Sequence, residues 1–207
     1  MADYFVERFL LSDNLQEDYY DRYGFLCGKY CFLNGELGYS FDDLKKIQDI
    51  VQNPFAIIVG EGGMGKTVFL KQVEKYLEEE KIPFLSLKLR DLAQQDVFIE
   101  KISSFCTKYQ NEVFILFDSV DEAIDLGIKN ISAILKDSLT KAKQINPKIK
   151  TIITSRQNQF PKEHLLGCLK PLFELEDDNI YELMKLRQED VEYIAQHFDC
   201  KNTQDFI

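Results

Sequence analysis

One octapeptide constrains this chain more than any other feature of the sequence. Residues 60–67 read Gly-Glu-Gly-Gly-Met-Gly-Lys-Thr and match the pattern G-x-x-x-x-G-K-[ST] without departure. They follow the apolar run Phe55–Val59 and open a stretch, Lys66 to Lys81, whose apolar residues recur at helical spacing. Glycines let the backbone approach phosphate oxygens closely, and N–H groups at a helix N-terminus attract negative charge. The sequence therefore predicts a strand, a phosphate-binding loop and a helix, in that order.

This loop predicts which residues hold the phosphates of a nucleotide. Lys66 is expected to reach the β- and γ-phosphates, and the Thr67 hydroxyl is expected to bind Mg²⁺. The alternative is a glycine-rich turn between a strand and a helix that binds no ligand. The nucleotide-binding residues that we expect are Gly60, Glu61, Gly62, Gly63, Met64, Gly65, Lys66, Thr67 and Val68.

A second part of the same site is expected at Asp118, directly after the apolar run Val113–Phe117. Open α/β sheets bind ligands at the carboxyl ends of their parallel strands, and Asp118 stands one strand–helix–strand unit after the loop. A carboxylate in this place holds Mg²⁺, here together with Thr67. An apolar strand that merely ends in an aspartate is the alternative.

Strands and helices alternate through the middle of the chain, which indicates an α/β fold with a mostly parallel sheet. Parallel strands joined by helices make right-handed crossovers. The expected strands are 55–59, 83–89, 113–117, 149–154 and 171–175, and the expected helices are 66–81, 96–109 and 130–143.

The overall charge excludes some classes of function. Asp and Glu number 35 against 25 Lys and Arg, which gives a net charge of −10 and argues against a general nucleic-acid or membrane-surface binder. The longest apolar runs fall far short of the roughly 18 residues of a membrane helix, and the acidic start lacks the basic region of a signal peptide. Five scattered cysteines are typical of reduced thiols. We therefore expect a cytoplasmic protein without a membrane partner or a direct nucleic-acid partner.

Several motifs together resemble the NACHT group of STAND NTPases over roughly residues 55–198. The loop and the three residues after it are similar to that group, and so is Asp-Ser-Val-Asp-Glu at 118–122, where a small residue follows the Mg²⁺ aspartate and an acid lies two further on. Weaker matches are Ser-Leu-Lys-Leu-Arg-Asp-Leu at 86–92, Thr-Ile-Ile-Thr-Ser-Arg at 151–156, and the stretch 181–194, which resembles the entry into a helical lid.

The resemblance implies roles for three further residues. In that family the arginine after the Thr-Ser pair lies near the γ-phosphate, and a guanidinium at the end of a neighbouring strand can bind phosphate through its fork, so Arg156 is expected to sense it. Asp121 is expected to orient or activate the attacking water, with Glu122 as the second candidate. Either acid could instead be solvated, Arg156 could be a surface arginine, and Arg90 could pair with the acidic cluster structurally.

The resemblance also implies a P-loop NTPase core of three α/β/α layers with sheet order 5-1-4-3-2. Residues 1–53 form an aromatic-rich N-terminal extension that we expect to pack on the core at 54–178. Residues 179–207 are expected to begin a helical lid that is incomplete here, because Asn202 looks like the cap of a further helix. The winged-helix domain of the family would then lie beyond the chain.

The function implied is an ATP-binding signalling switch that takes ATP or ADP with Mg²⁺. It would hydrolyse ATP slowly, because Ser119 stands where many P-loop ATPases carry a catalytic acid. In the family the nucleotide controls oligomerisation, so self-association in a longer chain is expected, and antiphage defence is a frequent prokaryotic role. The alternatives are an AAA+-like motor or loader, and a pseudo-ATPase module that binds nucleotide only as a structural ligand.

Overall fold

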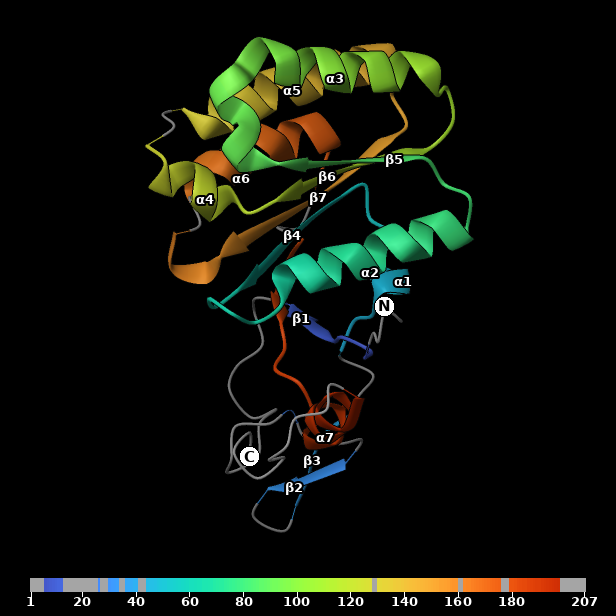
Figure 1. Cartoon of the computed structure of the whole chain (residues 1–207), viewed down its shortest axis with the longest axis vertical. Helices are drawn as coiled ribbons and strands as arrows, with labels where there is room; N and C mark the ends of the chain where they lie inside the picture. Colours follow the sequence, from blue (N-terminus) through green and yellow to red (C-terminus); the bar gives the residue numbers. More distant parts are fainter. Residues whose placement is uncertain are drawn as a thin grey trace.

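A six-stranded sheet with helices on both faces forms the centre of the protein in a computed structural model of the chain (Figure 1). The structure describes residues 6–12, 26, 30–33, 36–40, 44–127, 130–159, 162–175 and 179–197. No helix among these residues is both long enough and apolar enough to cross a membrane.

The sheet order is β1-β8-β4-β7-β6-β5, with the five strands from β8 to β5 parallel and β1 antiparallel at the edge. These five lie in the expected order 5-1-4-3-2, which confirms the α/β class, and the sixth strand, β1, was not predicted. The strands are β1 Leu10–Ser12, β4 Phe55–Gly60, β5 Phe84–Lys88, β6 Val113–Asp118, β7 Ile149–Arg156 and β8 Ile180–Leu183.

The fifth parallel strand was predicted at 171–175, and this prediction is wrong. Residues 171–173 are the last turn of α6, Lys162–Phe173, which buries Leu165, Leu169 and Phe173 at intervals of four. That spacing is helical, whereas the real strand β8 is only four residues long and follows the helix. The sheet therefore continues to Leu183, beyond residue 178, where we expected the core to end.

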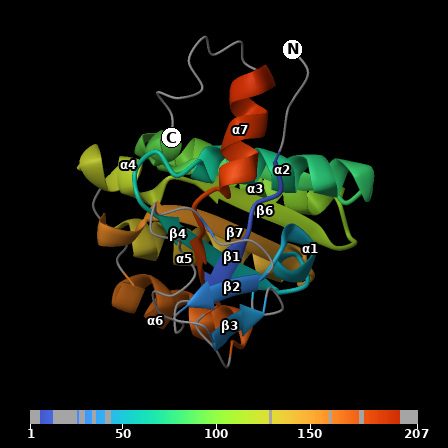
Figure 2. The same cartoon turned by 90° about the horizontal axis from the view of Figure 1, so that it is seen from below.

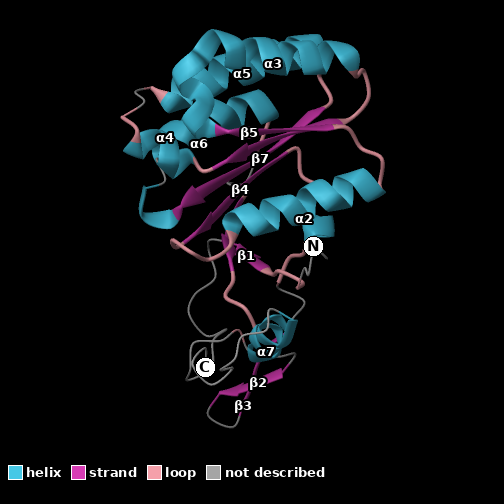
Figure 3. Ribbon diagram, viewed as in Figure 1, coloured by secondary structure: helices cyan, strands magenta, loops and turns pink. Residues whose placement is uncertain are grey.

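The helices form the two outer layers (Figure 3). The short helix α1 and α2 cover one face of the sheet, and α3, α5 and α6 cover the other, with α4 at the end of β6 (Figure 1). The helices expected at 66–81, 96–109 and 130–143 are confirmed within two residues at either end, whereas α4 and α6 were missed. Their bounds are α1 Ile47–Ile50, α2 Lys66–Glu79, α3 Gln95–Lys108, α4 Val120–Asp125 and α5 Ile131–Ile145.

Alternation along the strands divides the core into two clusters. Ile57 and Phe117 face α3, α5 and α6, while Ile58 and Phe114 on the same strands face α1 and α2. Because both faces are covered, β4 and β6 are buried at every position, which explains their unbroken apolar runs.

The described part of the N-terminal extension joins this sheet through β1, which pairs with β8 (Figure 2). Phe9 and Leu11 are buried with Leu26, Leu44 and Met184 in a third, smaller cluster. The hairpin of β2 Tyr30–Leu33 and β3 Glu36–Ser40, and the helix α7 Gln188–His197, lie beyond β1 at one end of the molecule (Figure 1). Most aromatic residues of the extension, and the helix expected to open near residue 202, lie outside the described residues.

The side chain of Asn146, at the C-terminal end of α5, bonds both to the loop that leads into β6 and to the loop that leads into β7. Its side-chain Nδ2 donates to the carbonyl oxygens of Tyr109 and Asn111 at 2.8 and 2.9 Å, and its Oδ1 accepts from the Lys148 N–H at 2.9 Å. The side chain is fully buried, so each of its polar atoms needs these partners.

We expect Asn146→Asp to lower the free energy of unfolding by about 3 kcal/mol, because a buried carboxylate would face two carbonyl oxygens without donating to either. The matched control is Gln110→Glu, the same chemical change at an exposed position of the first connection, with an expected effect within about 0.5 kcal/mol. Urea unfolding followed by circular dichroism measures both variants. Equal losses in the free energy of unfolding would contradict the role given to Asn146.

Candidate functional site

The loop between β4 and α2 takes the backbone conformation that its glycines permit. Gly63 and Gly65 have positive φ angles of 82° and 84°, a region that residues with a side chain adopt at a cost. Gly65 is the N-cap of α2, so the loop ends where the unpaired N–H groups of the helix begin. The loop and the first turn of α2 are therefore shaped to receive an anion.

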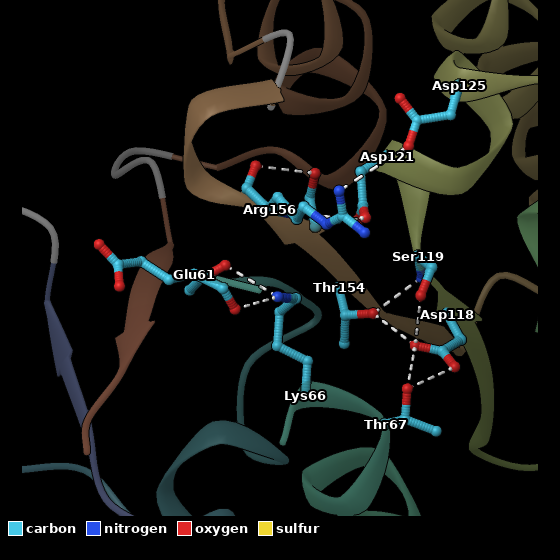
Figure 4. Close-up of polar contacts among 11 residues, drawn as sticks. Glu61, Lys66, Thr67, Asp118, Ser119, Asp121, Asp125, Thr154 and Arg156 are labelled. Atoms are coloured by element: carbon cyan, nitrogen blue, oxygen red, sulfur yellow. Dashed lines mark hydrogen bonds and ion pairs between the residues drawn. The ribbon is translucent and has the colours of Figure 1, made fainter. Parts of the chain in front are cut away.

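Lys66 lies beneath this loop and is only 9% exposed. Its Nζ donates to the carbonyl oxygens of Gly60 and Glu61, both at 2.8 Å (Figure 4). Burial lowers the pKa of Lys66 from its ordinary value and Arg156 adds to the decrease, whereas Asp121 and Asp118 oppose it. The ammonium group is thus held inside the loop by two carbonyl dipoles.

The Asp118 carboxylate at the end of β6 accepts three hydroxyl hydrogen bonds. Thr67 donates to its Oδ2 at 3.1 Å, while Thr154 and Ser119 donate to Oδ1 at 2.8 and 3.1 Å (Figure 4). The Thr154 hydroxyl in turn accepts the Ser119 N–H at 2.9 Å. This network joins α2, β6 and β7 and brings together the two predicted Mg²⁺ ligands, Thr67 and Asp118.

The chain turns sharply after Asp118. Ser119 adopts φ 63° and ψ 71°, the left-handed region, and is the N-cap of α4. Strained residues of this kind persist where the surrounding contacts fix them, and here the bonds to Thr154 and Asp118 do so. The turn carries Asp121 back toward the end of β7.

Asp121 is bound to Arg156 through both carboxylate oxygens. The backbone N–H of Arg156 donates to Oδ1 at 3.0 Å, and its Nε contacts Oδ2 at 2.9 Å. The Asp121 side chain is 4% exposed and that of Arg156 is 45% exposed; Nη1 of Arg156 also lies 3.8 Å from Asp125 (Figure 4). Of the two acids predicted to act on water, Asp121 is therefore bound to Arg156.

The other predicted residues lie less centrally. Glu122 is half exposed and its carboxylate lies 4.0 Å from Arg90, which agrees with the structural pairing considered for that arginine. Val68 is 46% exposed on the first turn of α2. The structure thus groups Lys66, Thr67 and Asp118 closely and turns Glu122 toward the 3₁₀ turn Leu89–Gln94.

Two polar residues of this region had no role assigned from the sequence. Thr154 lies beside Asp118 because β6 and β7 pair in register up to Phe117 and Ile153. A polar residue in an otherwise apolar strand could have pointed to Thr154 from the sequence. Arg8 donates to the carbonyl oxygen of Met64 in the loop at 2.9 Å. A lone arginine 56 residues before its partner gives no signal in the sequence.

A comparison with known protein families identifies this arrangement. The sequence model of the KAP family P-loop domain matches residues 43–204, more than half of the chain. The chain belongs to the KAP family of P-loop domains. The P-loop NTPase prediction is therefore confirmed. The match does not support the finer resemblance to the NACHT group. A search of curated proteins found no match.

A solved structure with a TM-score of 0.50 shares the fold of this KAP-family domain. PCH-2 from C. elegans superposes with a TM-score of 0.50 at 16% identity, covering 72% of this chain and 40% of that one. AMPPCP-bound DnaA from Aquifex aeolicus gives a TM-score of 0.49 at 18% identity, covering 74% of this chain and 48% of that one. The chain thus spans less than half the length of either structure.

The buried hydroxyls of Thr154 and Thr151 on β7 allow a matched test of the network. Thr154→Val removes the bond to Asp118 and leaves the Ser119 N–H without its acceptor, so we expect a loss of about 1–3 kcal/mol in the free energy of unfolding. Thr151 has no hydrogen-bond partner among the described residues, so Thr151→Val should be neutral or slightly stabilising. Urea unfolding of the nucleotide-free protein compares them, and equal losses would refute the role of Thr154.

Proposed function

We propose that this domain binds ATP or ADP together with Mg²⁺. The observation that carries the proposal is the junction of β4 and α2, where the Lys66 ammonium lies inside a glycine loop beside the bonded pair of Thr67 and Asp118. A cation, a helix N-terminus and a hydroxyl–carboxylate pair together match what a nucleoside triphosphate needs: partners for its phosphates and ligands for the Mg²⁺ that accompanies them.

The residues present fit phosphate at the loop. Carbonyl oxygens of Gly60 and Glu61 hold the ammonium group of Lys66 where a phosphate oxygen could replace them as its partner. Arg156 pairs in register with Gly60 at the start of the loop, and its charge helps to lower the pKa of Lys66. We propose that these two cations bind the β- and γ-phosphates, with the first N–H groups of α2.

The donor set also fits Mg²⁺. This ion prefers oxygen ligands, keeps several waters and is usually held by one or two carboxylates plus substrate phosphates. Thr67 and Asp118 supply one hydroxyl and one carboxylate 3.1 Å apart, and the described residues contain no cluster of three or more His, Cys, Asp or Glu that could hold the ion by itself. When bound, Mg²⁺ would neutralise charge on the phosphates, and Thr67 and Asp118 would hold it.

We propose that hydrolysis is slow and that Asp121 positions Arg156. Both oxygens of Asp121 already accept from Arg156, so this acid fixes the guanidinium at the end of β7. Glu122 lies half exposed beside Arg90, and Ser119 occupies the position directly after Asp118. Lys66 and Arg156 remain to stabilise the charge of the γ-phosphate during in-line attack by water.

The signalling role remains part of the proposal. A nucleotide-controlled switch that self-associates in a longer chain, and a place in antiphage defence, follow from the NACHT-like motifs alone. The alternative is an AAA+-like motor, and a turnover assay separates the two: slow hydrolysis supports the switch, while rapid hydrolysis stimulated by a partner supports the motor. Nucleotide binding without any hydrolysis would support the pseudo-ATPase alternative.

Lys66→Ala should weaken ATP binding by roughly 100-fold or more, about 2.7 kcal/mol, because it removes the cation inside the loop. The control is Lys71→Ala, which removes an exposed lysine from the same helix and should leave affinity unchanged. Isothermal titration with ATP and with ADP measures both variants. Absence of binding by the unmodified chain would refute the proposed function.

Asp118→Asn should reduce the gain in ATP affinity that Mg²⁺ produces, because an amide binds the cation less strongly than a carboxylate. Titrations with and without Mg²⁺ give the ratio of dissociation constants for the variant and for the original chain. Asp137→Asn on the exposed face of α5 is the matched control. An unchanged ratio in Asp118→Asn would remove Asp118 from the metal site.

A further inference from the structure

Arg8 joins three distant segments of the chain beside the phosphate-binding loop. Its side chain comes from just before β1 and the residue is only 6% exposed. Nη2 donates to the carbonyl oxygen of Met64 at 2.9 Å and to that of Met184 at 2.7 Å. Because Nη2 carries two hydrogens, it can serve both acceptors at once. Met64 belongs to the loop, and Met184 directly follows β8.

The contact of Arg8 with the Met64 carbonyl oxygen also determines the direction in which the N–H of Gly65 points. The peptide bond between Met64 and Gly65 is trans, so the carbonyl group of Met64 and the N–H of Gly65 point in opposite directions. Arg8 donates to the carbonyl oxygen of Met64, and the N–H of Gly65 is therefore aimed away from Nη2 of Arg8. A cation on the carbonyl oxygen also polarises the peptide and makes that N–H a stronger donor.

Gly65 is constrained twice at this contact. Its φ of 84° favours glycine, and a Cβ built on it would lie 2.9 Å from Nη1 of Arg8, closer than real Cβ atoms approach other atoms. The guanidinium thus occupies the space beside Gly65 that a side chain would need. Arg8 and the αL glycine form one unit at the start of α2.

We infer that Arg8 is a positioning residue of the phosphate-binding loop: it fixes the Met64–Gly65 peptide so that the Gly65 N–H faces the phosphates, and it ties this peptide to the segment between β8 and α7. The inference rests on the proposed binding of nucleotide. The role inferred for Arg8 runs through the Met64–Gly65 peptide group, whose carbonyl oxygen it binds. Its second bond, to Met184, makes nucleotide binding and the start of the α7 segment depend on the same guanidinium.

Binding of ATP and of tripolyphosphate to the full chain tests the inference. Arg8→Gln should weaken binding of both ligands by about tenfold or more, because the affected group faces phosphate and not the base. The control is Gln72→Met: Gln72 donates to the Val6 carbonyl oxygen at 2.7 Å and so anchors the same N-terminal segment to α2 through a bond that does not involve the loop. The affinities of Gln72→Met for ATP and for tripolyphosphate should stay within about twofold of those of the original chain. Equal losses in the two variants would overturn the inference.

Arg8→Lys separates charge from geometry. Lysine keeps the positive charge but lacks the planar fork that holds two carbonyl groups in fixed directions, so we expect weaker binding than in the original chain. The same variant decides the matter if Arg8→Gln fails to fold. Affinity equal to that of the original chain in Arg8→Lys would show that charge suffices and would overturn the positioning role.

The amide resonance of Gly65 gives a readout that needs no ligand. In ¹H–¹⁵N spectra of the nucleotide-free chain it should shift in Arg8→Gln and Arg8→Lys and keep its position in Gln72→Met. If the original chain binds no ATP while Gly65 still shifts, the proposed function fails and the contact with Met64 stands. If ATP binds but neither affinity nor resonance responds to Arg8, the inference alone fails.

Hydrogen exchange tests the link to Met184. ATP should slow exchange of the amides at 183–187 in the original chain and in Gln72→Met, and it should do so less in Arg8→Gln at saturating ligand. Equal protection in all three proteins would overturn the link between the loop and this segment.

Discussion

The carboxylate of Asp118 is the point on which the site depends. It accepts hydrogen bonds from the hydroxyl groups of Thr67 on α2, Ser119 at the start of α4 and Thr154 on β7, so one charge fixes three elements relative to one another. Parallel strands make this possible because their carboxyl ends meet at one edge of the sheet. Helices cover both faces of the sheet behind that edge, so the two core clusters along β4 and β6 are buried.

The two cations at this edge, Lys66 and Arg156, have separate partners. Lys66 is held by backbone carbonyl oxygens within the loop, whereas Arg156 is held by Asp121 at the end of β7. No single acid among the described residues lies at hydrogen-bond distance from both cations. Under the proposed function, one ligand with several phosphates binds both of them. The strained Ser119 makes this division possible, because its left-handed backbone turns α4 so that Asp121 meets Arg156.

Much of the fold could be predicted because the signals were local. The apolar runs at β4 and β6 and the helical periodicity of α2, α3 and α5 each lie within one continuous stretch. The errors arose where short elements give little periodicity. Residues 171–173 look like a strand in isolation, yet they complete the apolar face of α6, and β8 has only four residues. The edge strand β1 has three residues, and pairing with β8 is what makes it a strand.

The sequence by itself determined the glycine loop between β4 and α2, its lysine and threonine, and the aspartate that ends β6, the third parallel strand along the chain. These residues follow from steric freedom at glycine, from the charge of one lysine and from the regular path of a strand–helix–strand unit. Only the tertiary structure decided that Asp121 binds Arg156, that Thr154 donates to Asp118 and that Arg8 donates to the Met64 carbonyl oxygen in the loop. Those contacts join residues 35 or more positions apart, so local patterns in the sequence do not show which residues will meet. The contacts of Asp121 and Thr154 depend on where β7 lies beside β6 and on the left-handed turn at Ser119.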